Sequence, residues 1–103
     1  MSVQSATIAV LYTPVSMKTE QYDEIIRRAE EAGAGAPPGR LFHMCYGTEN
    51  NLRVLDLFDS EAAFQGFAQN LLPILGEVGV EFARPPEVVP VHNMIAAPAG
   101  ATA

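Results

Sequence analysis

The sequence predicts a single α+β domain whose elements follow in the order β-α-β-β-α-β. Short apolar runs rich in β-branched and aromatic residues alternate with longer stretches in which apolar residues recur every three or four positions. In addition, the runs at 40–47 and 51–59 are separated only by a short polar turn, which permits a hairpin but not a crossover. This order is that of a ferredoxin-like fold, in which two helices cover one face of a four-stranded antiparallel sheet.

The first half of the chain supplies one strand and one helix. Residues 7–13, TIAVLYT, are expected to form the first strand, which Pro14 ends. Thr19 is placed to cap the following helix. Its inward stripe is then Tyr22, Ile25, Ile26, Ala29 and Ala32. The run GAGAPPG from Gly33 contains the glycines and prolines that end a helix.

After the hairpin, a second helix and a last strand complete the domain. Ser60 is the expected helix cap, and Pro73 predicts a kink or an end near Leu72 because proline removes one backbone hydrogen bond. The last strand is expected over 87–95, with Pro90 placing it at an edge of the sheet. The domain thus spans 1–95, and 96–103 form a flexible tail without a large apolar side chain.

Composition excludes several classes of partner. The 103 residues are 49% hydrophobic and 17% charged, as in a globular protein of one domain. Twelve acidic against six basic side chains give a formal charge of −6, which disfavours nucleic acid and anionic membranes. The sequence shows no apolar run long enough to span a bilayer and no basic segment typical of a secretory leader. With Cys45 as its single cysteine, the protein is expected in the cytoplasm.

Three polar residues lie within the apolar runs of the hairpin: His43, Cys45 and Asp56. Strand alternation places Leu41, His43 and Cys45 on one face. A turn of two or four residues sets His43 directly opposite Asp56, whereas an odd turn sets it opposite a leucine. We favour the even turn because it gathers the polar residues on one face. The other face would then pack under the helices through Phe42, Met44, Tyr46, Leu55 and Leu57.

The His43–Asp56 pair is the candidate for acid–base chemistry. The carboxylate would fix the tautomer of the imidazole, which could then accept a proton from a phenol or an acidic C–H group. The alternative is a structural polar pair that only positions a ligand or sets the strand register. Cys45 with His43 and Asp56 could form a metal site or an activated thiol, but the spacing supports neither, so we expect no metal and no cofactor.

Other residues are candidates for contacts with a small apolar or aromatic ligand. Tyr12 ends the first strand at the expected rim of a cavity, and His92 and Asn93 lie in the last strand. Cys45 and Phe58 complete the predicted substrate-binding set. For His92 and Asn93 the alternative is a structural role near a dimer seam, since buried polar groups need hydrogen-bond partners in any case.

The segment LFHMCYGTENNLRVLDLFDSEAAFQGFAQNLLPIL and the ending PPEVVPVHNMI resemble the dimeric α+β barrel superfamily. Within it they resemble the antibiotic-biosynthesis-monooxygenase-like and stress-responsive proteins of bacteria. The resemblance covers about residues 6–95 and implies a homodimer whose two sheets face each other, with the last strand reaching toward the partner. A cavity would lie between sheet and helices or within the barrel.

Members of that superfamily differ in activity, so the resemblance leaves the reaction open. It implies either a cofactor-independent monooxygenase-like or isomerase-like enzyme acting on an aromatic or polyketide-type substrate, or a non-catalytic ligand-binding or stress-response protein. Many relatives have tryptophan where this chain has Phe58, and the chain contains no tryptophan. Haem-degrading relatives use a histidine on the second helix, and residues 60–76 contain none.

Overall fold

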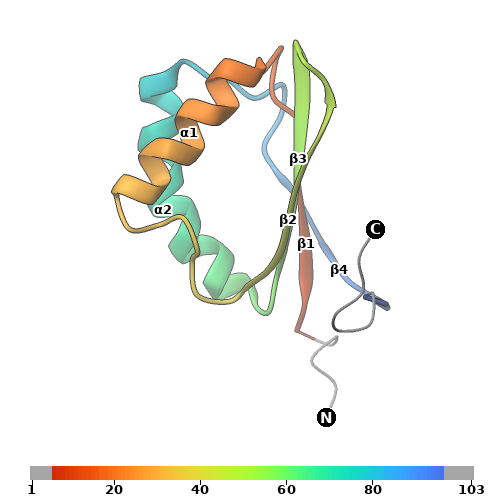
Figure 1. Ribbon diagram of the computed structural model, residues 1–103. Coiled ribbons are helices and arrows are strands. Elements are labelled where there is room, and N and C mark those ends of the chain that lie inside the picture. The colour runs from red at the N-terminus through yellow and green to blue at the C-terminus, as the bar shows by residue number, and fades with distance from the viewer. Residues whose placement is uncertain (1–5, 97–103) are drawn as a thin grey trace.

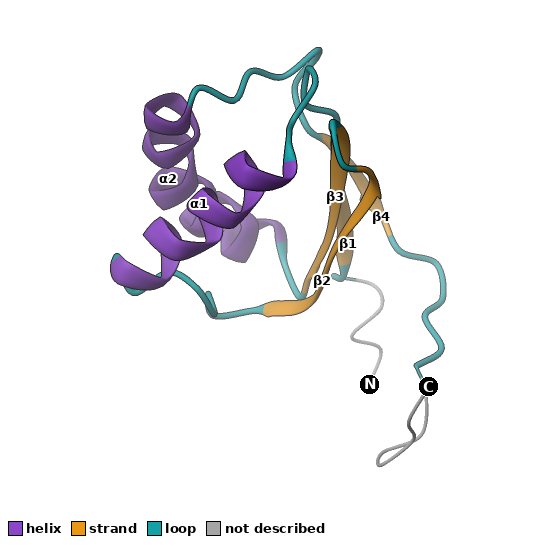
Figure 2. Ribbon diagram, turned by 45° about the horizontal axis from the view of Figure 1, so that its top comes forward, coloured by secondary structure: helices purple, strands orange, loops and turns teal. Residues whose placement is uncertain are grey.

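The computed structural model describes residues 6–96, and the element order is the predicted one. The strands are β1 (Ile8–Tyr12), β2 (Arg40–Thr48), β3 (Asn51–Phe58) and β4 (Glu87–Pro90), and the helices are α1 (Thr19–Glu31) and α2 (Glu61–Val78). All strand pairs are antiparallel, in the order β2-β3-β1-β4. Both helices lie on the same face of the sheet (Figure 1, Figure 2). The ferredoxin-like prediction is therefore confirmed.

The tail predicted at 96–103 lies outside the described residues except for Ala96. The prediction of one domain over 1–95 likewise extends beyond them at its start. In the described part of the chain, no helix is long and apolar enough to cross a membrane. The cytoplasmic location stays a prediction from the sequence.

The start of α1 differs from the prediction. Thr19 is the first helical residue rather than the cap, and Lys18 occupies the capping position, where its backbone N–H donates to the Gln21 side chain at 2.9 Å. The Thr19 hydroxyl instead donates to the carbonyl of Glu49 in the β2–β3 turn, at 3.2 Å. The Thr19 backbone N–H bonds the same carbonyl, so these contacts fix the start of α1 to the tip of the hairpin.

Helix α2 begins as predicted, because Ser60 accepts a hydrogen bond from the backbone of Ala63 at 3.1 Å. It does not end near Leu72, however, but continues through Pro73 to Val78. Proline removes only one backbone hydrogen bond, and the turn after it buries Ile74 and Leu75 in the core. The helix then ends at Gly79, whose φ of 86° is in the left-handed region.

Strand β4 is an edge strand, as Pro90 predicted, but it ends at Pro90 rather than at Ile95. Pro90 has no N–H to donate to the ladder, and one further backbone bond, from Val91 to Thr7 at 3.0 Å, follows it. Beyond this bond the described chain leaves the sheet, and Ile95 is 88% exposed.

The hairpin has the predicted even turn. Thr48 pairs with Asn51, which leaves a two-residue turn and sets His43 directly opposite Asp56. The assignment of the two faces was wrong, however: on β3, Val54, Asp56 and Phe58 are buried on the helix side. The outer face of the hairpin instead carries the side chains that we expected under the helices, namely Phe42, Met44, Tyr46, Leu55 and Leu57.

The start of β2 also departs from simple alternation. Arg40 pairs with Phe58 and Phe42 with Leu57, so Leu41 is an inserted residue at a bulge. Leu41 is 48% exposed, so the helices do not cover it. The bulge instead leaves Arg40 on the helix side, where its guanidinium lies over the ring of Phe67.

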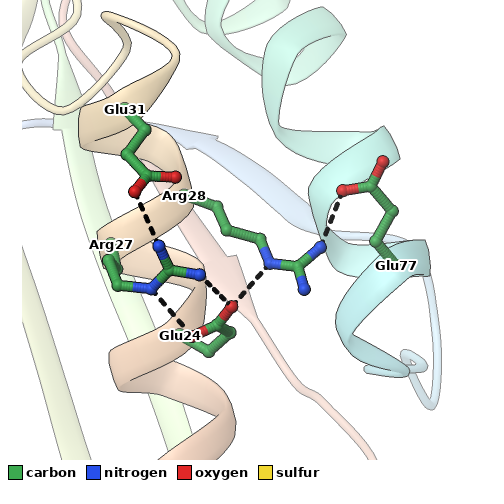
Figure 3. A network of polar contacts seen from close by, with 5 residues as sticks. All are labelled: Glu24, Arg27, Arg28, Glu31 and Glu77. Atoms are coloured by element: carbon green, nitrogen blue, oxygen red, sulfur yellow. Dashed lines mark hydrogen bonds and ion pairs between the residues drawn. The ribbon is translucent and has the colours of Figure 1, made fainter.

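A network of ion pairs joins the helices on their solvent side (Figure 3). Arg28 contacts Glu24 at 2.7 Å on its own helix and Glu77 of α2 at 2.9 Å. Arg27 contacts both Glu24 and Glu31. Hydrogen bonds from Arg27 and Arg28 lower the pKa of Glu24 to about 2. These pairs lie at the surface, so each contributes little to the stability of the fold.

Candidate functional site

Four side chains from four elements form one continuous chain of hydrogen bonds beneath the helices. His43 Nδ1 lies 2.6 Å from Asp56 Oδ1, and His43 Nε2 lies 2.6 Å from the hydroxyl oxygen of Tyr22. The Tyr12 hydroxyl donates to Asp56 Oδ2 at 3.2 Å. The order of the chain is thus Tyr22, His43, Asp56, Tyr12, and it contains both residues predicted as catalytic.

The topology explains why these residues meet. Asp56 lies in the middle of β3, between His43 on β2 and Val10 on β1, and its side chain points to the helix side. Tyr12 lies two residues beyond Val10 on the same face of β1. Tyr22 belongs to the inward stripe of α1, and its ring lies nearly parallel to the imidazole of His43 with 6.0 Å between ring centroids.

The Asp56 carboxylate is buried and therefore needs hydrogen-bond partners within the protein. Asp56 is 1% exposed, and a carboxylate at such a position is stable only when hydrogen bonds replace the lost water. Tyr12 and His43 both supply bonds to it. Within residues 6–96, every fully buried side-chain nitrogen or oxygen has a hydrogen-bond partner. The polar chain is therefore fully satisfied inside an apolar core.

The hydrogen-bond pattern also assigns the tautomer of His43. An ionised carboxylate only accepts hydrogen bonds, so His43 Nδ1 is assigned the hydrogen and donates it to Asp56 Oδ1. In the neutral imidazole, Nε2 is then the acceptor, and the Tyr22 hydroxyl donates to it.

The environment keeps both tyrosines protonated. Burial, followed by the charge of Asp56, raises the pKa of Tyr12 far above its ordinary value. Burial also raises the pKa of Tyr22, with smaller contributions from Cys45 and Asp56. The positive charge of Arg40 opposes both shifts without cancelling them. Each phenol is therefore a hydrogen-bond donor at neutral pH.

A cavity of about 70 Å³ lies between the sheet and the helices, next to this chain. It has room for a few water molecules or for one ring substituent of an organic ligand. Its wall is mostly apolar, with side chains such as Ile25, Phe67 and Leu71. The polar residues at the wall are Tyr12, Tyr22, Arg40, His43 and Asp56. Few polar groups in an apolar cavity are typical of a small-molecule site.

The other predicted contact residues lie away from this cavity wall. Cys45 is half-buried beyond His43, and burial raises the pKa of its thiol. Phe58 is fully buried and packs against Phe64 and Phe67 at 5.6 and 5.8 Å between ring centroids. His92 and Asn93 are exposed beyond the end of β4. Their roles as ligand contacts stay predictions.

Two of the polar residues at the cavity wall, Tyr22 and Arg40, were not among the predicted site residues. The sequence predicts that Tyr22 lies in the inward stripe of its helix. Its hydroxyl among apolar residues is the feature that could have indicated a polar contact in the core. Arg40 was placed at the start of a strand, and the bulge that turns it toward the helices has no clear signature in the sequence. Its side chain donates to the carbonyl of Gly35 at 2.9 Å. Within 6–96, no three His, Cys, Asp or Glu side chains are grouped as metal ligands would be.

No protein-family model matches the sequence, and no curated protein has significant sequence similarity to it. Several solved structures nevertheless share its fold. A protein of Chloroflexus aurantiacus named after the antibiotic biosynthesis monooxygenases is 7% identical, with a TM-score of 0.62 over 88% of this chain and 98% of that one. SnoaB, a cofactor-independent oxygenase of Streptomyces nogalater, is 13% identical, with a TM-score of 0.57 over 89% and 97%.

A third similar structure is the monooxygenase ActVA-Orf6 of Streptomyces coelicolor in complex with nanaomycin D. It is 16% identical, with a TM-score of 0.53 over 94% of this chain and 96% of that one. The chain thus has the ferredoxin-like α+β fold of the antibiotic-biosynthesis-monooxygenase-like structures, which confirms the resemblance at the level of the fold. At these identities the likeness does not extend to an activity.

Proposed function

We propose that this protein is a cofactor-independent enzyme that acts on an aromatic or polyketide-type substrate in the cavity beneath its helices. His43 is the general base, and Asp56 orients it. The 2.6 Å contact between His43 Nδ1 and Asp56 Oδ1 at the cavity wall carries this proposal, because it leaves the basic nitrogen of His43 directed away from the carboxylate.

Removal of a proton is the step that this site supports. A substrate anion forms, and the proton moves to the base beside the buried Asp56 carboxylate, which stabilises the resulting imidazolium. In an isomerase-like reaction the proton returns to another atom of the substrate. In an oxygenase-like reaction the electron-rich anion is oxidised by dioxygen as co-substrate. Both reactions begin with the same proton transfer.

The similar structures support the oxygenase-like reaction. SnoaB is described as a cofactor-independent oxygenase, and ActVA-Orf6 was solved with nanaomycin D. The lining of the present cavity, apolar with a few polar groups, suits a ligand of mostly apolar character. A substrate larger than the 70 Å³ void requires the helices and sheet to move apart.

A second candidate function is non-catalytic ligand binding, as in a stress-response protein. The observation that favours it is that both ring nitrogens of His43 already have partners, as a purely structural network would require. The two candidates differ in turnover: a binding protein retains its ligand unchanged, whereas the enzyme converts it and loses that ability when His43 is replaced.

We propose further that the active form is a homodimer. The outer face of the sheet exposes neighbouring apolar side chains, with Phe42 at 48% and both Met44 and Tyr46 at 39%. Such a face is unusual on a monomer, and a second copy of the chain would cover it. The similar structures support this arrangement only through their common fold.

Mass spectrometry of small molecules that co-purify with the protein tests the function first. Any ligand found, together with nanaomycin D as a defined probe, is then incubated with the wild-type protein and with His43→Ala. We expect conversion by the wild type and its loss in the variant. Binding without conversion by the wild type would instead support the non-catalytic function.

A further inference from the structure

His43 lines the cavity, but both of its ring nitrogens already have hydrogen-bond partners. Its Nε2 is 2.6 Å from the hydroxyl oxygen of Tyr22, and its Nδ1 is bound to Asp56. The Tyr22 ring also lies nearly parallel to the imidazole, with an interplanar angle of 9°. Tyr22 itself lines the cavity. A ligand proton can therefore reach His43 only by way of the Tyr22 hydroxyl or by displacing it.

We infer that Tyr22 is a catalytic residue that relays the proton of a weakly acidic substrate hydroxyl, a phenol or an enol, to His43. This inference rests on the proposed function, in which His43 is the base. The substrate O–H bond breaks, and its proton binds the Tyr22 oxygen. At the same time the Tyr22 proton passes to His43 Nε2. The products are a substrate oxyanion and an imidazolium, and Tyr22 ends the step protonated, with its hydroxyl turned toward the oxyanion.

The hydrogen-bond pattern selects a hydroxyl over a carbon acid. In the assigned tautomer Nε2 of His43 is the acceptor, so the Tyr22 hydroxyl, 2.6 Å away, donates to it, and the Tyr22 oxygen offers only lone pairs to the cavity. Lone pairs accept a hydrogen bond from an O–H group, whereas a C–H group forms at most a weak one. After the transfer, the same oxygen donates back to the oxyanion, so one residue serves both states of the substrate.

The charges around Tyr22 require the two proton movements to be coupled. Burial raises its pKa, and so do Cys45 on β2, Asp56 on β3 and Asp23 on its own helix, while Arg40 on β2 acts in the opposite direction. A free tyrosinate is therefore disfavoured at this position. A relay in which Tyr22 gains one proton as it loses another avoids that species.

Arg40 supplies the charge that the substrate oxyanion needs. It is at the wall of the same cavity and is held by the Gly35 carbonyl at 2.9 Å and by the ring of Phe67 at 5.5 Å. The fixed guanidinium makes the cavity favour an oxyanion over the neutral hydroxyl. The ligand class that fits both residues is an apolar ring compound with one acidic hydroxyl.

The test uses 4-nitrophenol, whose anion absorbs visible light, at a pH below the probe's own pKa. We compare the wild type with Tyr22→Phe, with His43→Gln and with Tyr46→Phe, which removes a hydroxyl on the outer face of the sheet. The wild type and Tyr46→Phe should bind the probe as its anion. Tyr22→Phe and His43→Gln should lower the ratio of bound anion to bound neutral probe about ten-fold, equivalent to one pKa unit.

The outcomes separate the relay from the proposed function. If Tyr22→Phe retains the anion signal and His43→Gln loses it, the substrate reaches His43 directly and the relay is wrong. If both variants retain the signal, His43 is not the base and the proposed function fails as well. Absence of bound anion in the wild type contradicts both.

A measurement without ligand checks the contact on which the relay depends. In ¹⁵N NMR spectra of the wild type, His43 should show a protonated Nδ1 and an Nε2 shifted by an accepted hydrogen bond. Tyr22→Phe should move the Nε2 resonance toward that of a free acceptor, while circular dichroism confirms an unchanged fold. An unchanged Nε2 resonance in the folded variant would overturn the inference.

Discussion

His43 and Asp56 stand directly opposite each other on β2 and β3, with 2.6 Å between Nδ1 and Oδ1. The two-residue turn at the tip of the hairpin fixes this pairing, because a shift of one residue would point one of the side chains to the other face. The contact is thus part of the strand register, and the position of His43, the proposed base, depends on the backbone as well as on side-chain packing.

Replacing Asp56 by asparagine should abolish most of the turnover of any substrate. An amide keeps the size of the carboxylate but no longer favours the imidazolium, and it can force the other tautomer of His43. We expect a loss of about 100-fold or more in kcat. Steady-state turnover measures the effect. Tyr46→Phe is assayed in parallel as a control and should retain wild-type activity. Equal kcat in Asp56→Asn and wild type would remove Asp56 from the mechanism.

The Tyr12→Phe variant should lower the free energy of unfolding by about 1–3 kcal/mol. The substitution removes the donor to Asp56 Oδ2 and leaves one oxygen of a 1% exposed carboxylate without this bond. Urea unfolding at neutral pH measures the effect. Tyr46→Phe is the matched control, since its hydroxyl lies on the outer face. Equal losses in both variants would show that the Tyr12 bond contributes little.

Tyr12 should also make the protein lose stability at alkaline pH. Its folded-state pKa is raised above the ordinary value of 10.0, so above that pH the unfolded chain releases a proton that the folded chain keeps. Ionisation therefore favours the unfolded state, and the free energy of unfolding falls as the pH rises beyond about 10. Tyr12→Phe should show a shallower fall in urea titrations. An identical slope in wild type and variant would contradict the shift.

The Cys45 thiol should react slowly with iodoacetamide at neutral pH. Burial, followed by the negative charge of Asp23, raises its pKa and so lowers the fraction of reactive thiolate. We expect a rate several-fold below that of glutathione. Asp23→Asn should increase the rate slightly. Alkylation faster than that of glutathione would point to an activated thiol instead.

Placing a charge on the outer face of the sheet should break the proposed dimer. Met44→Asp puts a carboxylate in the centre of that apolar face, and we expect the dissociation constant to rise about 100-fold or more. Leu72→Asp is the control, because Leu72 is a 59% exposed apolar residue on α2, away from the sheet. Sedimentation velocity should show monomer only for Met44→Asp. A monomeric wild type would contradict the proposal.

Strand alternation left two pairings open, and the even turn was chosen because it gathers the polar residues on one face; this choice predicted the His43–Asp56 pair correctly. The choice of faces could not be made in the same way. Both faces of the hairpin are apolar, and the expectation that polar residues avoid the helix side failed. Asp56 is tolerated there because Tyr12 and His43 bond both of its oxygens.

The positions of Tyr22 and Arg40 at the cavity could not be predicted from the sequence pattern, for a different reason. The helical spacing predicted that Tyr22 points inward, but its contact with His43 depends on how α1 is placed over the sheet, which is a tertiary property. Arg40 reaches the cavity only because the bulge at Leu41 shifts the strand by one residue. Periodicity carries no information on either feature. Strand β4 ends at Pro90, which pairs with Ile8, the first residue of β1. The end of β4 therefore depends on where β1 begins as well as on the residues of β4.

The central claim is that His43 receives a proton from a ligand in the cavity beneath the helices. The most direct measurement is the ¹⁵N NMR spectrum of His43 before and after saturation with 4-nitrophenol. We predict that the neutral imidazole becomes an imidazolium, with both ring nitrogens protonated, as the bound probe becomes its anion. A bound anion beside an imidazole that stays neutral would contradict the account.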